Sequence, residues 1–376
     1  MIYLDYAANS PVDKEVLDIF YKTNLEHFAN PNSFHKLGLE AKELLNQASK
    51  DILKYLDLTD REIIYTSGAT ESNNLAIKGI CERYKSQGKH IIIGAFEHNS
   101  ITVPVTTLQQ KGFEVDVVPV DHHGLIDLEE LQLLLQEDTI LVSICAVDSE
   151  LGIRQPIEQI AKIIKQFEQC CFHVDASQAI GKVNIDYSDV DLITLTPHKF
   201  YGLEGFGALI KKMNIGLKPL LEGGRSTTIY RSGTPCLSGA IAMAKAIEIA
   251  ITKQSERSQY VQELNQMIYK RLSVYSDICF HSNQYSIPYI MNLSIKNIKV
   301  SSLMTKLENH EIYISTKTSC CPQNTPSKII YAYTHNKSLA LSSMRISLSH
   351  LTTKKDIQTF LDIFEQCYKE CKNGKI

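Results

Sequence analysis

The chain has 376 residues, of which 44% are hydrophobic and 22% charged, and its formal net charge is -3 at pH 7. This length predicts a large domain plus a smaller one, and the slightly negative charge argues against direct binding of nucleic acid. No apolar run approaches the length of a membrane span, and the first six residues lack the basic start and apolar core of a secretory signal. We therefore expect a cytoplasmic protein.

The predicted elements over the first 212 residues alternate between short apolar strands and longer helices. Strands are expected at 63–65, 90–93, 114–120, 139–146, 172–174, 191–195 and 207–210, with helices at 70–85, 128–135 and 157–167 between them. This alternation is typical of βαβ units. It predicts an α/β fold with a mainly parallel seven-stranded sheet that is flanked by helices.

After about residue 237 the pattern changes. One long helix is expected over 240–272, followed by strands at 290–295, 311–314 and 344–348 and a last helix at 354–371. We place a domain boundary inside the long helix. Residues 13–250 would form the large domain, and residues 1–12 together with 251–376 a smaller α+β domain.

The ten cysteines are expected to be thiols, because the cytoplasm is reducing. None forms a Cys-x-x-Cys pair, which argues against a zinc site. Cys170 and Cys171 lie in an apolar run and should be buried packing residues. Cys320 and Cys321 lie in the polar stretch 315–326, which predicts an exposed loop. A thiol there is either an incidental surface cysteine or a nucleophile whose pKa the nearby Lys317 lowers.

Five polar clusters follow predicted strands, at residues 67–74, 97–98, 148–150, 173–178 and 196–199. In an open parallel sheet, ligands bind at the carboxyl ends of the strands. Because these ends share one edge of the sheet, the five clusters predict one common site.

Several residues of these clusters have a chemical interpretation beside a structural one. The stretch from Ser67 to Thr70 opens a helix and would bind a phosphate, or it is an ordinary helix cap. Asp175 would pair with a protonated pyridine nitrogen or form a salt bridge. Lys199 would form a Schiff base with an aldehyde cofactor or is a solvated surface charge. Arg345 would clamp a carboxylate or form a buried interdomain ion pair.

Eight stretches in this chain carry a further signal. They are YLDYAA (3–8), NPNSFH (30–35), TSGATESNNLA (66–76), GLID (124–127), HVDASQ (173–178), HKFYG (198–202), RSGT (231–234) and RISL (345–348). Together and in this order they resemble the cysteine desulfurases, which are fold-type I pyridoxal-phosphate enzymes of the class V aminotransferase group. The resemblance covers the chain from Tyr3 to about Thr352.

The resemblance implies how pyridoxal 5'-phosphate is bound. Lys199 would hold the cofactor covalently and move protons, and Asp175 would pair with the pyridine nitrogen. His98 would stack on the ring and act in acid–base steps, while Gln178 and Ser149 would contact the phenolic oxygen. The residues that resemble a phosphate cup are Ala69, Thr70, Thr196 and His198.

The resemblance also implies a reaction and partners. Asn30 and Arg345 would hold the carboxylate of L-cysteine, and Cys320 would take its sulfur as a persulfide while alanine leaves. Thr234 matches a position that reaches the partner subunit's phosphate, so a homodimer is implied. The 25 positions from Cys320 to Arg345 resemble the long-loop branch of the family. That branch delivers sulfur to a protein acceptor in iron–sulfur cluster assembly or tRNA thiolation.

Two departures from the family pattern keep alternatives open. Ser149 stands where the family usually has asparagine, and Lys317 where it usually has glycine; Lys317 is either a neighbour that lowers the pKa of Cys320 or a solvated charge. One alternative function is a related pyridoxal-phosphate enzyme, such as a selenocysteine lyase, a cysteine lyase or an aminotransferase, although the retained Cys320 argues against it. The other is a non-catalytic sulfur-relay scaffold, against which Lys199 argues.

Overall fold

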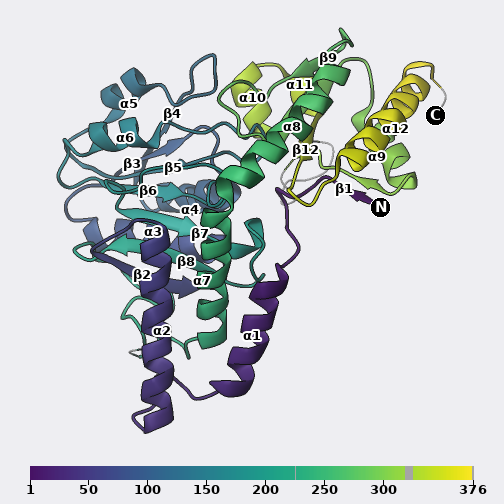
Figure 1. Cartoon of the computed structure of the whole chain (residues 1–376). Coiled ribbons are helices and arrows are strands. Elements are labelled where there is room, and N and C mark those ends of the chain that lie inside the picture. Colours follow the sequence, from purple (N-terminus) through teal and green to yellow (C-terminus); the bar gives the residue numbers. More distant parts are fainter. Residues whose placement is uncertain (225, 318–324, 375–376) are drawn as a thin grey trace.

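A computed structural model describes residues 1–224, 226–317 and 325–374 (Figure 1). Its main feature is a seven-stranded sheet with the order β2-β8-β7-β6-β5-β3-β4. Strand β8 runs antiparallel to both neighbours, and the other pairs are parallel. The strands are β2 Arg61–Thr66, β3 His90–Gly94, β4 Glu114–Val118, β5 Thr139–Cys145, β6 Cys171–Asp175, β7 Leu192–Leu195 and β8 Gly207–Lys212. The predicted mainly parallel sheet of seven strands is confirmed.

The sheet is buried on both faces, which explains its nearly continuous apolar strands. Along β3, Ile91 and Ile93 belong to one apolar cluster and Ile92 to another, because successive side chains point to opposite faces. Helices α3 (Ala69–Tyr84) and α4 (Asn99–Gln109) contribute to the first cluster. The second cluster takes side chains from α1 (Lys14–Glu26), α2 (Lys36–Tyr55), α5 (Leu128–Leu134), α6 (Ile157–Ile164) and α7 (Leu237–Thr252).

The prediction of one continuous helix over 240–272 is wrong. This stretch consists of two helices, α7 and α8 (Gln254–Leu272), which meet at Lys253. Before this break, the Thr252 hydroxyl donates to the carbonyl oxygen of Glu248 at 2.7 Å, a bond that is associated with bending of helices. The break lies close to the predicted domain boundary at residue 250, and that boundary itself stays a prediction.

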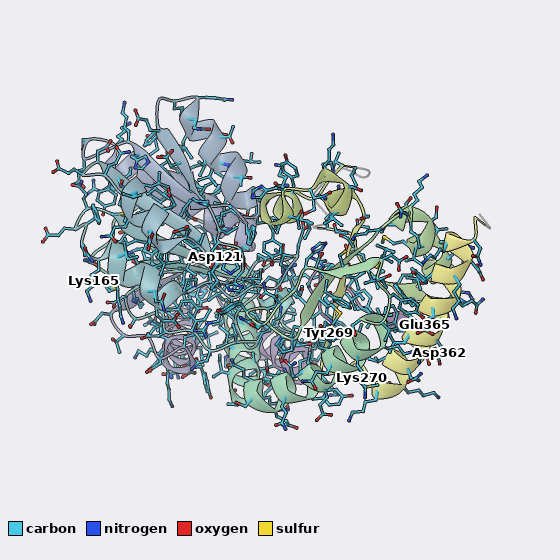
Figure 2. All side chains as sticks on the ribbon, turned by 90° about the horizontal axis from the view of Figure 1, so that it is seen from above. Asp121, Lys165, Tyr269, Lys270, Asp362 and Glu365 are labelled. Carbon is cyan, nitrogen blue, oxygen red and sulfur yellow. The ribbon has the colours of Figure 1, made fainter. Side chains whose placement is uncertain are left out.

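The smaller part is an α+β unit, as predicted. Its antiparallel sheet has the order β12-β10-β9, from Ser343–Ser347, Ile290–Ile295 and Ile278–Phe280. Helices α9 (Val300–Asn309), α10 (Lys328–Thr334), α11 (Lys337–Leu341) and α12 (Lys354–Lys372) belong to it. Seen from above, α12 lies along α8 at the outer edge (Figure 2), where Arg271 on α8 pairs with both Asp362 and Glu365.

The chain start is part of this smaller unit. Strand β1 (Ile2–Tyr3) pairs in parallel with β11 (Ile312–Tyr313). Strand β11 lies within the strand predicted at 311–314, whereas β1 and β9, with two and three residues, were not predicted.

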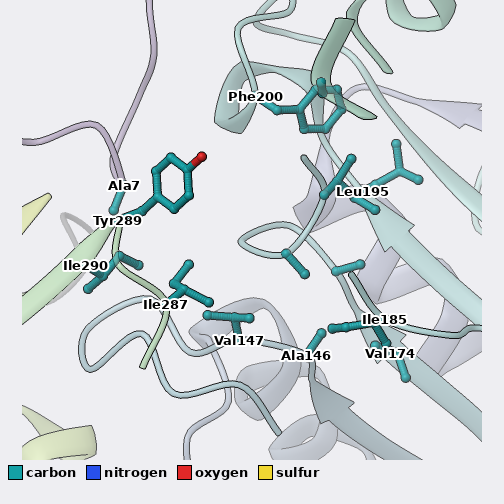
Figure 3. Packing of buried hydrophobic residues seen from close by; sticks show 14 of the residues in the cluster. Ala7, Ala146, Val147, Val174, Ile185, Leu195, Phe200, Ile287, Tyr289 and Ile290 are labelled. Atoms are coloured by element: carbon teal, nitrogen blue, oxygen red, sulfur yellow. The ribbon is translucent and has the colours of Figure 1, made fainter. Parts of the chain in front are cut away.

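The two units meet where the segment before β10 packs against the loop after β5. Figure 3 shows Ile287 beside Val147, and Tyr289, Ile290 and Ala146 belong to the same apolar cluster. The backbone N–H of Ile287 donates to the carbonyl oxygen of Gly152 at 2.8 Å. No helix in the described part of the chain is long and apolar enough to cross a membrane.

Candidate active site

A cavity of about 410 Å³ lies at the carboxyl edge of the seven-stranded sheet, within the size range of small-molecule sites. It is bordered by residues that follow β2, β3, β5, β6 and β7, and by residues from both ends of the chain. Ten of the predicted site residues line it: Ala69, Thr70, His98, Ser149, Asp175, Gln178, Thr196, His198, Lys199 and Arg345. The structure thus brings these ten residues together at one cavity, and their roles there stay predictions.

Lys199 lies in a 3-10 turn, Pro197–Lys199, that follows β7 rather than in the strand itself. Its Nζ donates to the carbonyl oxygens of Ala7 and Ala8 at 2.8 and 2.6 Å. Gln178 Nε2 also donates to Ala7, at 2.8 Å. The interpretation of Lys199 as a solvated surface charge is therefore wrong, because two main-chain acceptors hold its amine in the cavity.

Asp175 and His98 are joined by one hydrogen-bond network. Asn73 Nδ2 donates to Asp175 Oδ2 and to Ser100 Oγ, both at 2.8 Å. Ser177 adds its N–H and its hydroxyl, which donate to Asp175 Oδ1 at 3.0 and 2.6 Å. Both carboxylate oxygens are thus fixed, and Asp175 faces the cavity in one orientation.

His98 caps the start of α4 and faces the cavity. Its Nδ1 accepts the N–H of Ser100 at 3.1 Å and lies 2.8 Å from the Ser100 hydroxyl. Because Nδ1 is an acceptor, the neutral ring carries its proton on Nε2. Burial lowers the pKa of His98. The ring is therefore held neutral, with one defined donor, at neutral pH.

The start of α3 forms a cradle for an anion. Its N-cap is Gly68, at φ +153°, and no side chain caps the helix, so the first N–H groups, at Ala69 and Thr70, point out of the helix start. Gly207 on β8 packs directly against Gly68: a Cβ at Gly207 would lie 2.6 Å from the Cα of Gly68. The two glycines thus let the backbone come close to the cavity.

Thr196 and His198 complete the cradle. The Thr196 hydroxyl donates to the carbonyl oxygen of Phe206 at 3.0 Å and lies 2.9 Å from His198 Nδ1. Burial, and next to it the charge of Lys199, lower the pKa of His198 to about 4. A bound phosphate would reverse that effect, because an anion favours the protonated ring.

Arg345 lies in β12 and is only 1% exposed. Its Nη2 pairs with Asp5 at 2.6 Å, and its Nη1 donates to the carbonyl oxygen of Ser149 at 2.7 Å. Asp5 and Arg345 both belong to the predicted small domain, so this ion pair is buried but does not join two domains as expected, and it does not use the whole side chain. Within the described chain, the buried Nε has no hydrogen-bond partner. A guanidinium group, which only donates, suits a carboxylate ligand where it borders a cavity.

Sequence reasoning assigned no role to several groups at this site: the carbonyls of Ala7 and Ala8, Asn73 and Cys145. Any residue type supplies a main-chain acceptor, so the sequence does not reveal the carbonyls. Cys145 could have been predicted at the site, because it is the last residue of a buried strand whose carboxyl end faces the site. Burial raises the pKa of Cys145 well above its ordinary value. Its thiol therefore stays protonated at neutral pH and is a poor nucleophile.

Asn30 and Thr234 do not line the cavity of their own chain. Both are exposed. The loops that carry them meet at Ser226, whose hydroxyl accepts from Asn32 Nδ2 at 3.0 Å and donates to the carbonyl oxygen of Gly233 at 2.7 Å. The expected pairing of Asn30 with Arg345 at one site is thus not seen within a single chain.

The predicted persulfide cysteine, Cys320, and its neighbour Cys321 lie outside the described residues. Lys317, which precedes them, is buried, and its Nζ donates to the carbonyl oxygen and hydroxyl of Thr325 at 2.6 and 2.7 Å. The interpretation of Lys317 as a solvated charge is wrong, and its effect on Cys320 stays a prediction. Cys170 and Cys171 are buried packing residues, as predicted.

The chain matches a known family over nearly its whole length. The sequence model of the family described as "Aminotransferase class-V" matches residues 2–360. The chain belongs to this family. The cysteine desulfurase IscS of Dictyoglomus turgidum is 35% identical over 376 residues, which cover 99% of this chain and 95% of the relative. The cysteine desulfurase IscS of Buchnera aphidicola subsp. Baizongia pistaciae is 36% identical over 381 residues, covering 99% and 94%.

Solved structures agree with this family. A NifS-like protein superimposes with a TM-score of 0.91 at 32% identity, covering 98% of this chain and 99% of its own. The structure of SspA in complex with cysteine has a TM-score of 0.82 at 29% identity, with 94% and 100% covered. Members of the family are pyridoxal-phosphate enzymes, and these relatives place the chain among the cysteine desulfurases. The non-catalytic alternative is left without support.

Proposed function

We propose that this family member converts L-cysteine to L-alanine with pyridoxal 5'-phosphate in the 410 Å³ cavity, and that Cys320 takes the sulfur as a persulfide. One observation carries the proposal: an uncapped helix start, a fixed carboxylate, a lysine amine and a buried arginine converge on one cavity. The curated relatives named cysteine desulfurase support the reaction.

The residues present fit the cofactor part by part. The N–H groups of Ala69 and Thr70, together with Thr196 and His198, would hold the phosphate. Asp175 would pair with the pyridine nitrogen and keep it protonated. Lys199 would bind the aldehyde carbon. When bound, the cofactor supplies an electron sink that stabilises negative charge next to the substrate's amino group.

The remaining residues would bind and cleave the substrate. Arg345 would hold its carboxylate through the free Nε–H and the remaining Nη protons. Lys199, once displaced, would move the proton of the substrate's α-carbon, and His98 would donate from Nε2. The Cys320 thiolate would then attack the substrate sulfur. One S–S bond forms, one C–S bond breaks and the carbon takes a proton, so alanine and a Cys320 persulfide result without an external oxidant.

The first test is an assay of wild type and Cys320→Ala with L-cysteine and a thiol reductant, in which alanine and sulfide are measured together. We expect equal amounts of both products from wild type and neither product from the variant. Cys371→Ala, on the far helix α12, is the control and should behave as wild type. Sulfide from Cys320→Ala, or pyruvate in place of alanine from wild type, would show an elimination reaction and contradict the proposal.

The persulfide would pass to a protein sulfur acceptor, in iron–sulfur cluster assembly or in tRNA thiolation. The test loads the wild-type protein with sulfur from radiolabelled L-cysteine and adds purified scaffold or sulfurtransferase proteins. Label should move to one acceptor and not to the same acceptor with its cysteines replaced. Label that stays on this chain with every candidate would contradict delivery to such proteins.

We also propose a homodimer. One face of α1 carries a stripe of exposed apolar side chains, Leu17, Tyr21 and Leu25, and it continues to Phe28, which is 79% exposed. Apolar stripes of this kind mark interfaces, and the segments of Asn30 and Thr234 lie outside their own cavity. Both would then act across the interface.

Light scattering after size exclusion tests the dimer. Wild type should have about twice the chain mass of 42.4 kDa, and Leu25→Glu should shift the mass toward that of one chain. Lys22→Glu changes charge on the same helix outside the stripe and should leave the mass unchanged. A wild-type protein that runs as a monomer would rule the dimer out.

A further inference from the structure

Lys182 is a buried lysine behind the cavity. It follows β6 in a turn, and only 8% of the residue is exposed. Its Nζ donates to Gln178 Oε1 at 2.7 Å. The charges that act on it are of its own sign: burial first, and then Lys199 and Arg345, lower the pKa of Lys182 to about 7. An ammonium in such surroundings is unfavourable for stability.

A chain of hydrogen bonds joins Lys182 to the cofactor lysine. Gln178 Nε2 donates to the carbonyl oxygen of Ala7, and Lys199 Nζ donates to the same oxygen, both at 2.8 Å. Lys182 Nζ donates to Gln178 Oε1, and the carbonyl oxygen of Ala7 can only accept, so Gln178 turns its Oε1 toward Lys182. Its NH₂ group then faces Ala7 and the cavity. The two ends of an amide have nearly the same shape, so the Lys182 donor and the Ala7 acceptor together decide which end the cavity meets.

We propose that Lys182 is a positioning residue: it fixes the Gln178 amide with its N–H donors toward the cavity, and through Ala7 it keeps Gln178 and Lys199 in register for a bound cofactor. The inference rests on the proposed function, because the ligand to which Gln178 would present its donor is pyridoxal 5'-phosphate. Lys182 itself does not line the cavity.

The chemistry of the position favours this role over a purely structural one. Packing alone would be satisfied by an apolar side chain of the same length, without a buried charge. Methionine has nearly this length and removes only the donor. Arginine keeps a donor, and Lys182 also borders a second hollow of about 950 Å³ beside Arg154 and Tyr285, which leaves room for the larger head group.

The test compares wild type, Lys182→Met, Lys182→Arg and the control Lys162→Met, which is exposed on α6. Pyridoxal 5'-phosphate is titrated into each apoprotein to give its dissociation constant, and the visible absorption band of each loaded protein and the melting temperature of each apoprotein are recorded. For Lys182→Met we expect about tenfold weaker binding, which corresponds to about 1.4 kcal/mol, and a shifted band. Its apoprotein should melt within a few degrees of wild type. Lys182→Arg and Lys162→Met should bind within about twofold of wild type.

Four outcomes separate the possibilities. Weaker binding and a shifted band that arginine restores support the inference. If Lys182→Met has the affinity and absorption band of wild type, the inference is overturned. It is also overturned if the apoprotein of Lys182→Met has a lowered melting temperature that fully accounts for its weak binding, and if Lys182→Arg does not restore that temperature. A wild-type protein that binds no pyridoxal 5'-phosphate would overturn the proposed function itself.

Discussion

Lys182 makes the stability of the apoprotein depend on pH in a defined direction. Its pKa is about 7 in the folded chain and 10.5 in an unfolded one, so between these values the unfolded state binds a proton that the folded state does not. Stability therefore rises with pH across this window. In urea denaturation at pH 6 to 9, the free energy of unfolding of wild type should rise relative to that of Lys182→Met above pH 7. The free energy of unfolding of Lys162→Met should change with pH as that of wild type does. Parallel curves for wild type and Lys182→Met would contradict the shifted pKa.

Asn73 orients two candidate catalytic residues, Asp175 directly and His98 through Ser100. Its replacement by alanine removes the donor to Asp175 and the donor to Ser100, which orients His98. We expect Asn73→Ala to lower kcat about 10- to 100-fold, since hydrogen bonds to charged groups contribute about 1.5–3 kcal/mol. The neighbour Asn74, which bonds the carbonyl of Thr70 on its own helix, is the matched control. Equal losses in Asn73→Ala and Asn74→Ala would mean that only the helix had been weakened.

At the residue scale, the sequence predicted groups that carry charge or stand in a polar cluster after a strand. Lys199, Asp175 and Arg345 were found in this way, and all line the cavity. The main-chain carbonyls of Ala7 and Ala8 could not be found, because any residue supplies the same acceptor and their placement depends on contacts far along the chain.

Two elements, β8 and α3, meet through glycine, and this contact controls the anion cradle. A Cβ at Gly207 would lie 2.6 Å from the Cα of Gly68, a backbone atom that cannot move aside cheaply. Gly207→Ala should therefore displace the start of α3 and weaken pyridoxal 5'-phosphate binding at least tenfold in an apoprotein titration. A Cβ at Gly216 would lie 3.1 Å from Arg83 Nε, which belongs to a flexible side chain that can move aside. Gly216→Ala should therefore bind pyridoxal 5'-phosphate as wild type does. Normal binding by Gly207→Ala would show that the cradle tolerates the shift.

At the element scale, the strands of the large sheet were predictable because they are buried on both faces and therefore read as apolar runs. The break at Lys253 was not, because residues on both sides favour helix and no glycine or proline marks it. Such a break depends on which faces α7 and α8 bury. That is a property of the packed molecule rather than of local propensity.

The whole molecule is held together at the loop after β5, where the two units share one apolar cluster. Ile290 is 1% exposed, and its Cβ would lie 2.8 Å from a Cβ at Gly152. Ile290→Ala should lower the free energy of unfolding by about 2–5 kcal/mol, measured by urea denaturation. The exposed Val274→Ala, at the end of α8, should change it by less than about 0.5 kcal/mol. A loss for Ile290→Ala as small as that of the control would mean that the junction contributes little.

The pairing of the first residues has a consequence for how the protein is made. Ile2 and Tyr3 pair with β11, and Ser347 donates its N–H to the Leu4 carbonyl and accepts the N–H of Ala7. These residues leave the ribosome long before their partners, which lie as many as 340 positions further along the chain and emerge tens of seconds later at roughly 5–20 residues per second. The carbonyl groups of Ala7 and Ala8 cannot take their places beside Lys199 before these partners have been translated. A nascent chain could thus complete its large sheet early and still lack the part of the cavity wall that Ala7 and Ala8 form until Ser347 has been translated.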